Sequence, residues 1–142
     1  MTEAAANQPT EPDPSSGRPV VLVVDDEILL RSVVAEYLRD AGFRVVEAAN
    51  GREAVTVLAA GEAVDVVFSD VRMPGDVSGY DLAEWVRINR PAVGVLLASG
   101  YVGNSGRSRH VGGNAPTLLT KPFDYERLLQ QLRDLISLRN GA

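Results

Sequence analysis

The strongest constraint on the fold is an alternation of short apolar runs with amphipathic stretches, which begins at residue 19. The first run, residues 20–24 (VVLVV), is aliphatic throughout, which is typical of a strand buried on both faces of a sheet. The stretch 27–41 has apolar residues at helical spacing and is followed by Gly42, a common helix stop. The buried face of this helix is expected to consist of Leu30, Val34, Tyr37, Leu38 and Ala41.

The same alternation continues along the chain and predicts the remaining elements. Asn50 with Glu53, and Asp124, are typical of helix starts, and Pro91 ends a helix. A crossover helix is also expected within 101–114, where four glycines and the lack of apolar periodicity predict a poor one. Strands are expected at 20–24, 43–48, 64–69, 93–98 and 115–119, and helices at 27–41, 50–60, 78–90 and 125–138.

Strands that alternate with helices at this spacing predict an α/β fold, a doubly wound parallel sheet with helices on both faces. Because crossovers between parallel strands are right-handed, functional loops lie at the carboxyl ends of the strands. The domain is expected to span residues 19–142. Residues 1–18 are rich in alanine, proline, serine, threonine and glutamate and are expected to form a disordered tail, since they cannot bury enough apolar surface to fold.

The composition excludes several classes of function. The net charge of −5 argues against direct binding of nucleic acid, which needs a basic surface. Cysteine is absent, which excludes disulfides, zinc–thiolate sites and cysteine nucleophiles, and the single His110 excludes a multi-histidine metal site. No apolar run approaches the roughly 18 residues of a membrane span. Since no signal-peptide pattern is present either, we expect a cytoplasmic protein without membrane insertion.

Polar residues gather where the predicted strands end. Since the first and third strands are neighbours in a doubly wound sheet, Asp25, Asp26 and Asp70 should converge. Two like charges 4 Å apart repel by about 4 kcal/mol at an effective dielectric constant near 20. Three carboxylates together therefore indicate a bound cation, and Mg²⁺ with oxygen ligands is the common choice. The first predicted strand is followed by Asp25, Asp26 and Glu27, and the third by Asp70. The fourth is followed by Ser99, and the fifth by Thr120, Lys121 and Pro122.

Each acidic residue taken alone has a second interpretation. Asp26 and Asp70 stand just before a turn or helix, where a carboxylate often caps the backbone. The three carboxylates taken together with Lys121 and Ser99 favour the cation site. Lys121 supplies a positive charge in addition to the cation, and Ser99 supplies a hydroxyl donor between the cation and Lys121.

Four stretches in this order resemble the receiver domain of two-component response regulators. They are VLVVDDE at 21–27, DVRMPG at 70–75, LLASGY at 96–101 and LLTKPF at 118–123. Each stretch alone is weak evidence, whereas their order at successive strand ends is specific. The resemblance covers residues 19–138 and implies a flavodoxin-like five-stranded sheet with the strand order 2-1-3-4-5.

The resemblance implies a phosphoacceptor signalling module that assists its own phosphorylation, rather than an enzyme with a separate substrate. Asp70 would accept a phosphoryl group from a histidine kinase or a histidine phosphotransfer protein. Mg²⁺ would be held by Asp70, directly by Asp26, mostly through water by Asp25, and by the backbone carbonyl of Arg72.

Lys121 and Ser99 would bind the phosphoryl oxygens and so favour an active conformation. The family also often has a cis peptide here, between Lys121 and Pro122. The chain ends four residues after its last predicted helix, so we expect a single-domain regulator. Its output would be a downstream protein partner or onward phosphotransfer, and a phosphorylation-dependent dimer is a further candidate.

Three features depart from the commonest family pattern. Leu118 stands three residues before Lys121, where many members have an aromatic residue that swings inward on activation. Tyr101 is the candidate replacement, with packing against the next helix as the alternative. The loop 70–79 is one residue longer than usual, and with the ASGY sequence it is more similar to receivers of hybrid sensor kinases. The side chain of Arg72 can overhang the phosphoryl group and alter its hydrolysis.

Three alternatives remain at this point. A haloacid-dehalogenase-type hydrolase also uses Asp, Mg²⁺ and Lys, but needs a second Asp two positions after its nucleophile, where Glu27 follows Asp25. A phosphate-independent pseudo-receiver scaffold typically lacks the acceptor Asp or the Lys, both of which are present as Asp70 and Lys121. The chain can also be a receiver excised from a hybrid sensor kinase.

The other candidates are expected to have ordinary structural roles. His110 is expected in a solvated loop, and Tyr80 and Trp85 are expected to pack at helical spacing. The residues that could form a basic patch are expected to be solvated surface: Arg87, Arg107 and Arg109.

Overall fold

The computed structural model describes residues 17–100 and 116–141. The described strands form one five-stranded parallel sheet with the order β2-β1-β3-β4-β5, which confirms the predicted fold class and strand order. Residues 1–16 of the predicted tail and the crossover helix expected at 101–114 lie outside the described residues. The strands are β1 (Val20–Val24), β2 (Arg44–Ala48), β3 (Val66–Asp70), β4 (Gly94–Ser99) and β5 (Thr117–Thr120).

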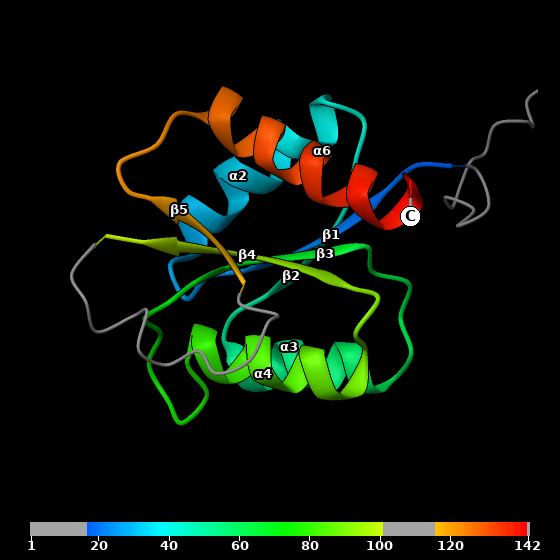
Figure 1. Cartoon of the computed structure of the whole chain (residues 1–142). Coiled ribbons are helices and arrows are strands. Elements are labelled where there is room, and N and C mark those ends of the chain that lie inside the picture. Colours follow the sequence, from blue (N-terminus) through cyan, green and yellow to red (C-terminus); the bar gives the residue numbers. More distant parts are fainter. Residues whose placement is uncertain (1–16, 101–115, 142) are drawn as a thin grey trace, which may run out of the picture.

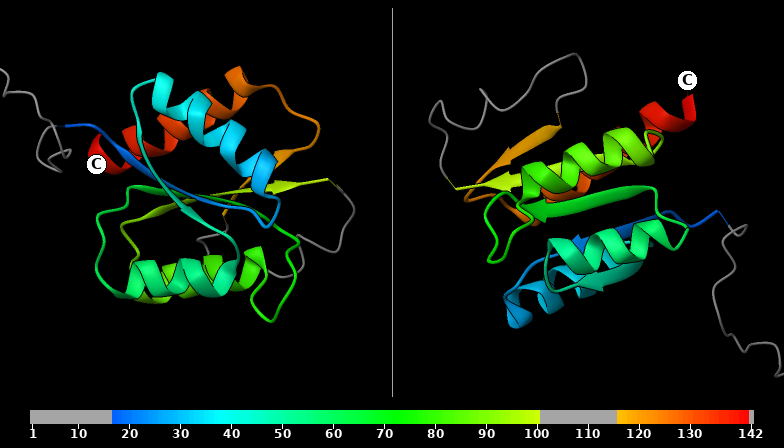
Figure 2. Two further views of the ribbon diagram at one scale, coloured as in Figure 1. Left: turned by 180° about the vertical axis from the view of Figure 1, so that it is seen from behind. Right: turned by 90° about the horizontal axis from the view of Figure 1, so that it is seen from below.

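In the described part of the chain, helices cover both faces of the sheet (Figure 1). α2 (Ile28–Asp40) and α6 (Tyr125–Gly141) lie on one face. α3 (Gly51–Ala59) and α4 (Gly79–Asn89) lie on the other, and the left view of Figure 2 shows the same three layers from behind. Within the described ranges no helix is long and apolar enough to cross a bilayer.

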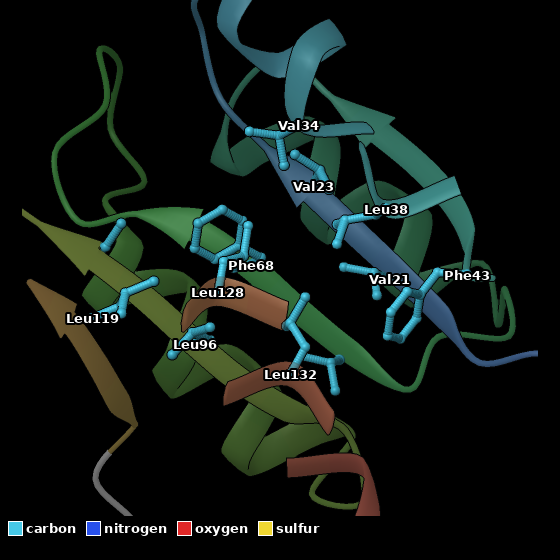
Figure 3. Packing of buried hydrophobic residues seen from close by; sticks show 12 residues of the cluster. Val21, Val23, Val34, Leu38, Phe43, Phe68, Leu96, Leu119, Leu128 and Leu132 are labelled. Carbon is cyan, nitrogen blue, oxygen red and sulfur yellow. The ribbon is translucent and has the colours of Figure 1, made fainter. Parts of the chain in front are cut away.

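Alternate residues of β1 face opposite sides of the sheet and contribute to two separate core layers. Val21 and Val23 of β1 face α2 and α6, whereas Val20, Leu22 and Val24 face α3 and α4. Figure 3 shows the first layer, in which side chains of β1, β3, β4 and β5 meet those of α2 and α6. Full burial of one such side chain stabilises the fold by about 1.5–3 kcal/mol. The continuous apolar run at 20–24 is thus explained by burial on both faces.

The predicted helix caps at Asn50 and Asp124 are confirmed. Asn50 Oδ1 accepts the backbone N–H of Glu53 at 2.8 Å, and the Glu53 carboxylate accepts the N–H of Ala49 at 2.8 Å. Asp124 Oδ1 accepts the N–H of Arg127 at 2.8 Å. These bonds satisfy N–H groups that have no partner inside the helix.

The third strand begins two residues later than predicted, at Val66, and it includes Asp70. Asp65 precedes it and is bound to the start of β1. Its Oδ2 accepts the N–H of Val20 at 2.8 Å, and its own N–H donates to the Val20 carbonyl at 2.9 Å. The carboxylate inside this apolar run therefore ties the start of β1 to the residue that precedes β3.

The predicted buried face of α2 is wrong at Leu30, whose exposed fraction is 48%. Val34 and Leu38 are buried as predicted, and Tyr37 and Ala41 are partly buried against the same layer. Leu30 lies in the first turn of the helix and lines a groove at the carboxyl edge of the sheet instead of the packed layer.

Gly79, the first residue of α4, packs against the backbone that carries Asp70. Its N–H donates to the Val71 carbonyl at 2.8 Å. A Cβ atom on Gly79 would overlap the Asp70 carbonyl oxygen and lie 2.8 Å from Val71 Cα. Ser78 and Asp81 form a capping box that fixes the same turn. The start of α4 therefore supports the end of β3.

We expect Gly79→Ala to lower the free energy of unfolding by about 1–3 kcal/mol, the usual cost of overpacking. Gly94→Ala is the matched control, because its Cβ would approach the Val66 side chain only to 3.5 Å, an ordinary contact. Urea denaturation of both variants measures the difference. Wild-type stability of Gly79→Ala would contradict the close packing described here.

Candidate functional site

Three carboxylates meet at the carboxyl ends of β1 and β3. Asp25 and Asp26 follow β1, and Asp70 is the last residue of β3. Each offers a carboxylate oxygen within 4.8 Å of the other two. The parallel register pairs Val24 with Ser69, which brings the residues that follow them side by side. The predicted convergence of the three carboxylates is confirmed.

Lys121 brings a positive charge to this cluster from the connection between β5 and α6. Its Nζ lies 2.6 Å from Asp70 Oδ1, and the two side chains are 41% and 17% exposed. The backbone N–H of Lys121 donates to the Ser99 carbonyl at 2.8 Å. The peptide bond between Lys121 and Pro122 is cis, as the resemblance implies. The acidic cluster is thus joined to the ends of two further strands.

Ser99 is the last residue of β4 and is half-buried. It pairs in register with Thr120, and the residue before it, Ala98, pairs with Asp70. Ser99 therefore lies on the strand between those that lead to Asp70 and Lys121. Arg72 lies two residues beyond Asp70 with an exposed side chain.

The pKa of the Asp25 carboxyl is raised above its ordinary value, mainly because burial disfavours the charged form. The nearby carboxylates of Asp70 and Asp26 raise the pKa further. The hydrogen bond from the Glu27 N–H to Asp25 Oδ1, 2.9 Å long, and the charge of Lys121 oppose the shift. Burial and the neighbouring carboxylates together therefore outweigh the hydrogen bond and the charge of Lys121.

The donor set fits a hard divalent cation. All three groups are carboxylates, and with Lys121 they leave two negative charges when fully ionised. Mg²⁺ prefers oxygen ligands and binds through a few carboxylates while keeping several waters. Asp25, Asp26 and Asp70 are the residues that would hold it.

A groove of about 540 Å³ lies beside the carboxylates, between α2 and the start of α6. Its polar lining includes Asp25, Asp70 and Lys121. The cluster is therefore accessible from the edge of the sheet, next to an apolar surface. That surface includes Leu30, Val34, Phe68, Ala98, Phe123 and Tyr125.

Comparison with known families agrees with this geometry. The family described as "Response regulator receiver domain" matches residues 21–133, which run from the second residue of β1 past β5 and include the whole acidic cluster. The chain belongs to this family. Aspartate phosphorylation and Mg²⁺ binding at an acidic cluster are general properties of receiver domains, which interact with histidine kinases or phosphotransfer proteins.

Curated relatives include regulators and a sensor kinase. The probable transcriptional regulatory protein TcrX of Mycobacterium tuberculosis is 35% identical over 123 residues, which cover 86% of this chain and 52% of TcrX. Sensor kinase CckA of Brucella abortus is 32% identical over 123 residues, which cover 85% of this chain and 13% of the kinase. This receiver thus spans about half of the first relative and a small part of the second.

Solved receiver structures share the fold over nearly their whole length. The response regulator receiver protein from Sinorhizobium medicae has a TM-score of 0.79 at 28% identity, covering 87% of this chain and 98% of that one. The receiver domain of the hybrid histidine kinase CckA has a TM-score of 0.66 at 33% identity, covering 82% of this chain and 98% of that one.

Three further residues of this receiver that the sequence analysis singled out lie outside the acidic cluster. Trp85 is half-buried on α4 and packs against the second core layer, as predicted. Arg87 is paired with Glu84 at 2.5 Å. Leu118 lies on β5 with 37% of its surface exposed. The candidates that lie outside the described residues are Tyr101, Arg107, Arg109 and His110.

The sequence interpretation missed Arg31, which contacts the loop of the acidic cluster. Arg31 Nη1 donates to the backbone carbonyl of Asp25 at 2.7 Å, and its Nε donates to Glu47 Oε1 at 3.0 Å. Helical side chains lean toward the N-terminus of their helix, so a residue in the first turn of α2 can reach the preceding loop. The position of Arg31 in the first turn could therefore have indicated its contact with the loop. Nothing in the neighbouring sequence indicates its pairing with Glu47 on β2.

We expect Asp25→Asn to raise the melting temperature near neutral pH in the absence of divalent cations. The raised pKa means that the folded protein holds the Asp25 proton more tightly than the unfolded chain does, so ionisation of this carboxyl destabilises the fold. The gain should therefore be largest above the raised pKa and should shrink as the pH falls through it toward 3.8.

Thermal unfolding in EDTA across this pH range measures the effect. Glu36→Gln is the matched control, because Glu36 is an exposed acid in the middle of α2. A gain that grows as the pH falls would contradict the expected direction.

Proposed function

We propose that residues 19–142 act as a phosphorylation-controlled receiver, with Asp70 as the phosphoacceptor and Mg²⁺ as the cofactor. The observation that carries this proposal is the 2.6 Å ion pair between Lys121 Nζ and Asp70 Oδ1 inside a cluster of three carboxylates. A pseudo-receiver scaffold would not need this pair. The spacing of Asp25 and Glu27 also remains unlike that of a haloacid-dehalogenase-type hydrolase.

In the proposed reaction an oxygen of Asp70 attacks the phosphorus of a phosphohistidine. The new P–O bond forms as the P–N bond breaks, and the electron pair leaves with the histidine nitrogen. Asp25, Asp26, Asp70 and the Arg72 carbonyl would hold Mg²⁺. When bound, this ion neutralises charge on the phosphoryl oxygens. Positioning and charge neutralisation account for most of the catalysis in phosphoryl transfer, so few protein groups are needed.

The proposed role of Lys121 and Ser99 is to bind the phosphoryl group once it is on Asp70 and so to detect phosphorylation. The Lys121 ammonium, now paired with Asp70, would also contact a phosphoryl oxygen, and the Ser99 hydroxyl would donate to another. Such contacts exist only in the phosphorylated form, so they shift the population of the loops that carry them.

The proposed phosphodonor is a histidine kinase or a histidine phosphotransfer protein, and the proposed output is binding to a downstream protein or onward phosphotransfer. This assignment is supported by the relatives, which include a sensor kinase and transcriptional regulators. We place the protein in the cytoplasm, where such phosphodonors act. The module assists its own phosphorylation, and no separate substrate is proposed.

We expect incubation with Mg²⁺ and acetyl phosphate to add one phosphoryl group on Asp70, and Asp70→Asn to abolish it. Intact mass with peptide mapping measures the adduct. Asp76→Asn is the matched control, because Asp76 is an exposed acid in the same loop that pairs with Arg52. A stable adduct on Asp70→Asn, or an equal yield without Mg²⁺, would refute the assignment.

Lys121→Ala is expected to leave phosphorylation possible and to weaken the conformational response. Beryllofluoride, a mimic of the phosphoryl group, should perturb the backbone amide spectrum of the wild type around Ser99 and Thr120. The same perturbations should be largely absent in Lys121→Ala, because the ammonium that contacts the anion is gone. Wild-type perturbations in the variant would exclude Lys121 as the sensor.

A further inference from the structure

Arg31 connects the acidic loop to two other parts of the fold. It lies in the first turn of α2, and only 14% of its side chain is exposed. Nη1 donates to the Asp25 carbonyl at 2.7 Å, and Nε donates to Glu47 Oε1 on β2 at 3.0 Å. One planar group with several N–H donors thus binds the loop and the strand at the same time.

Glu47 determines what Arg31 contributes to the acidic loop. Its carboxylate pairs with Arg31 through one oxygen and with Arg39 through the other, at 3.4 Å. Glu47 compensates part of the guanidinium charge and orients the group, and the contact of Arg31 with the loop is a directed hydrogen bond to the Asp25 carbonyl. Largely buried charged groups are stable only when they are paired and hydrogen-bonded in this way.

The loop held by Arg31 is short and carries two of the three carboxylates. Residues 25–27 connect β1 to α2, and the Asp25 N–H donates to the Ala48 carbonyl at 3.1 Å. Asp25 Oδ1 accepts the N–H of Glu27. Arg31 fixes the peptide between Asp25 and Asp26, which is the peptide whose rotation would turn these two carboxylates away from Asp70.

We propose that Arg31 is a positioning residue that holds Asp25 and Asp26 in the geometry for binding a divalent cation. It does not contact the ion. The inference rests on the proposed function, since it assigns the ion to the same three carboxylates. Residues that orient metal ligands typically change metal affinity by about 10- to 100-fold when they are removed.

The test is titration of the full chain with Mg²⁺ by isothermal titration calorimetry. Arg31→Met should raise the dissociation constant by about tenfold or more. Arg39→Met is the matched control: it also removes a pair to Glu47 but no contact to the Asp25 carbonyl, and should bind Mg²⁺ like the wild type. If Arg31→Met does not fold, Arg31→Gln, which is too short to reach both partners, is measured in its place.

A second measurement separates positioning from general stability. Without metal, the Asp26 amide resonance should shift in the Arg31 variant but not in Arg39→Met, because the Asp25 carbonyl belongs to the same peptide group. A lower melting temperature together with a wild-type dissociation constant would show a structural role alone and overturn the inference. That result would leave the proposed function intact, whereas failure of the wild type to bind Mg²⁺ would overturn both.

Discussion

The parallel pairing of β1 with β3 is the constraint on which the site depends. Its register sets Val24 beside Ser69, so that Asp25 and Asp70 leave the sheet side by side. Carboxylates this close repel one another by several kcal/mol, about 4 kcal/mol for one pair at 4 Å and an effective dielectric constant near 20. The fold must therefore supply both the stability that holds them together and the charge that compensates them. Lys121 supplies part of that charge.

The stability comes from the two core layers on either side of the sheet. β1 is buried on both faces, so the strand that leads to Asp25 cannot shift without breaking contacts with helices on both sides. The start of α4 supports the end of β3, because Gly79 allows the helix to approach the Asp70 backbone closely. Acidic groups that repel one another thus lie at the ends of rigid elements, where relaxation of the backbone is costly.

The parallel sheet and the convergence of Asp25, Asp26 and Asp70 could be predicted from the sequence, because both follow from local patterns and from the topology of doubly wound sheets. The full strand order was implied by the resemblance to receiver domains. Asp65 and Arg31 could not be interpreted in this way. Asp65 interrupts an apolar run, and its partner is the N–H of Val20, 45 residues away. Arg31 binds Glu47 across 16 residues, and a polar residue on an amphipathic helix is normally solvated.

Leu30 has helical spacing that fits a buried face, yet it lines the groove because burial depends on the neighbouring connection to α6.

The position of Lys121 explains how a change of charge at one carboxylate could reach two strands. Its ammonium is bound to Asp70, while its backbone N–H is bound to the Ser99 carbonyl at the end of β4. In the proposed function phosphorylation turns the Asp70 carboxylate into an acyl phosphate, so that the negative charge facing the ammonium moves from Asp70 to the phosphoryl oxygens. The side chain is 41% exposed and can follow the new charge, but its backbone is held by β4 and by the end of β5. In the proposed function a local electrostatic change at Asp70 would thereby act on the ends of both β4 and β5.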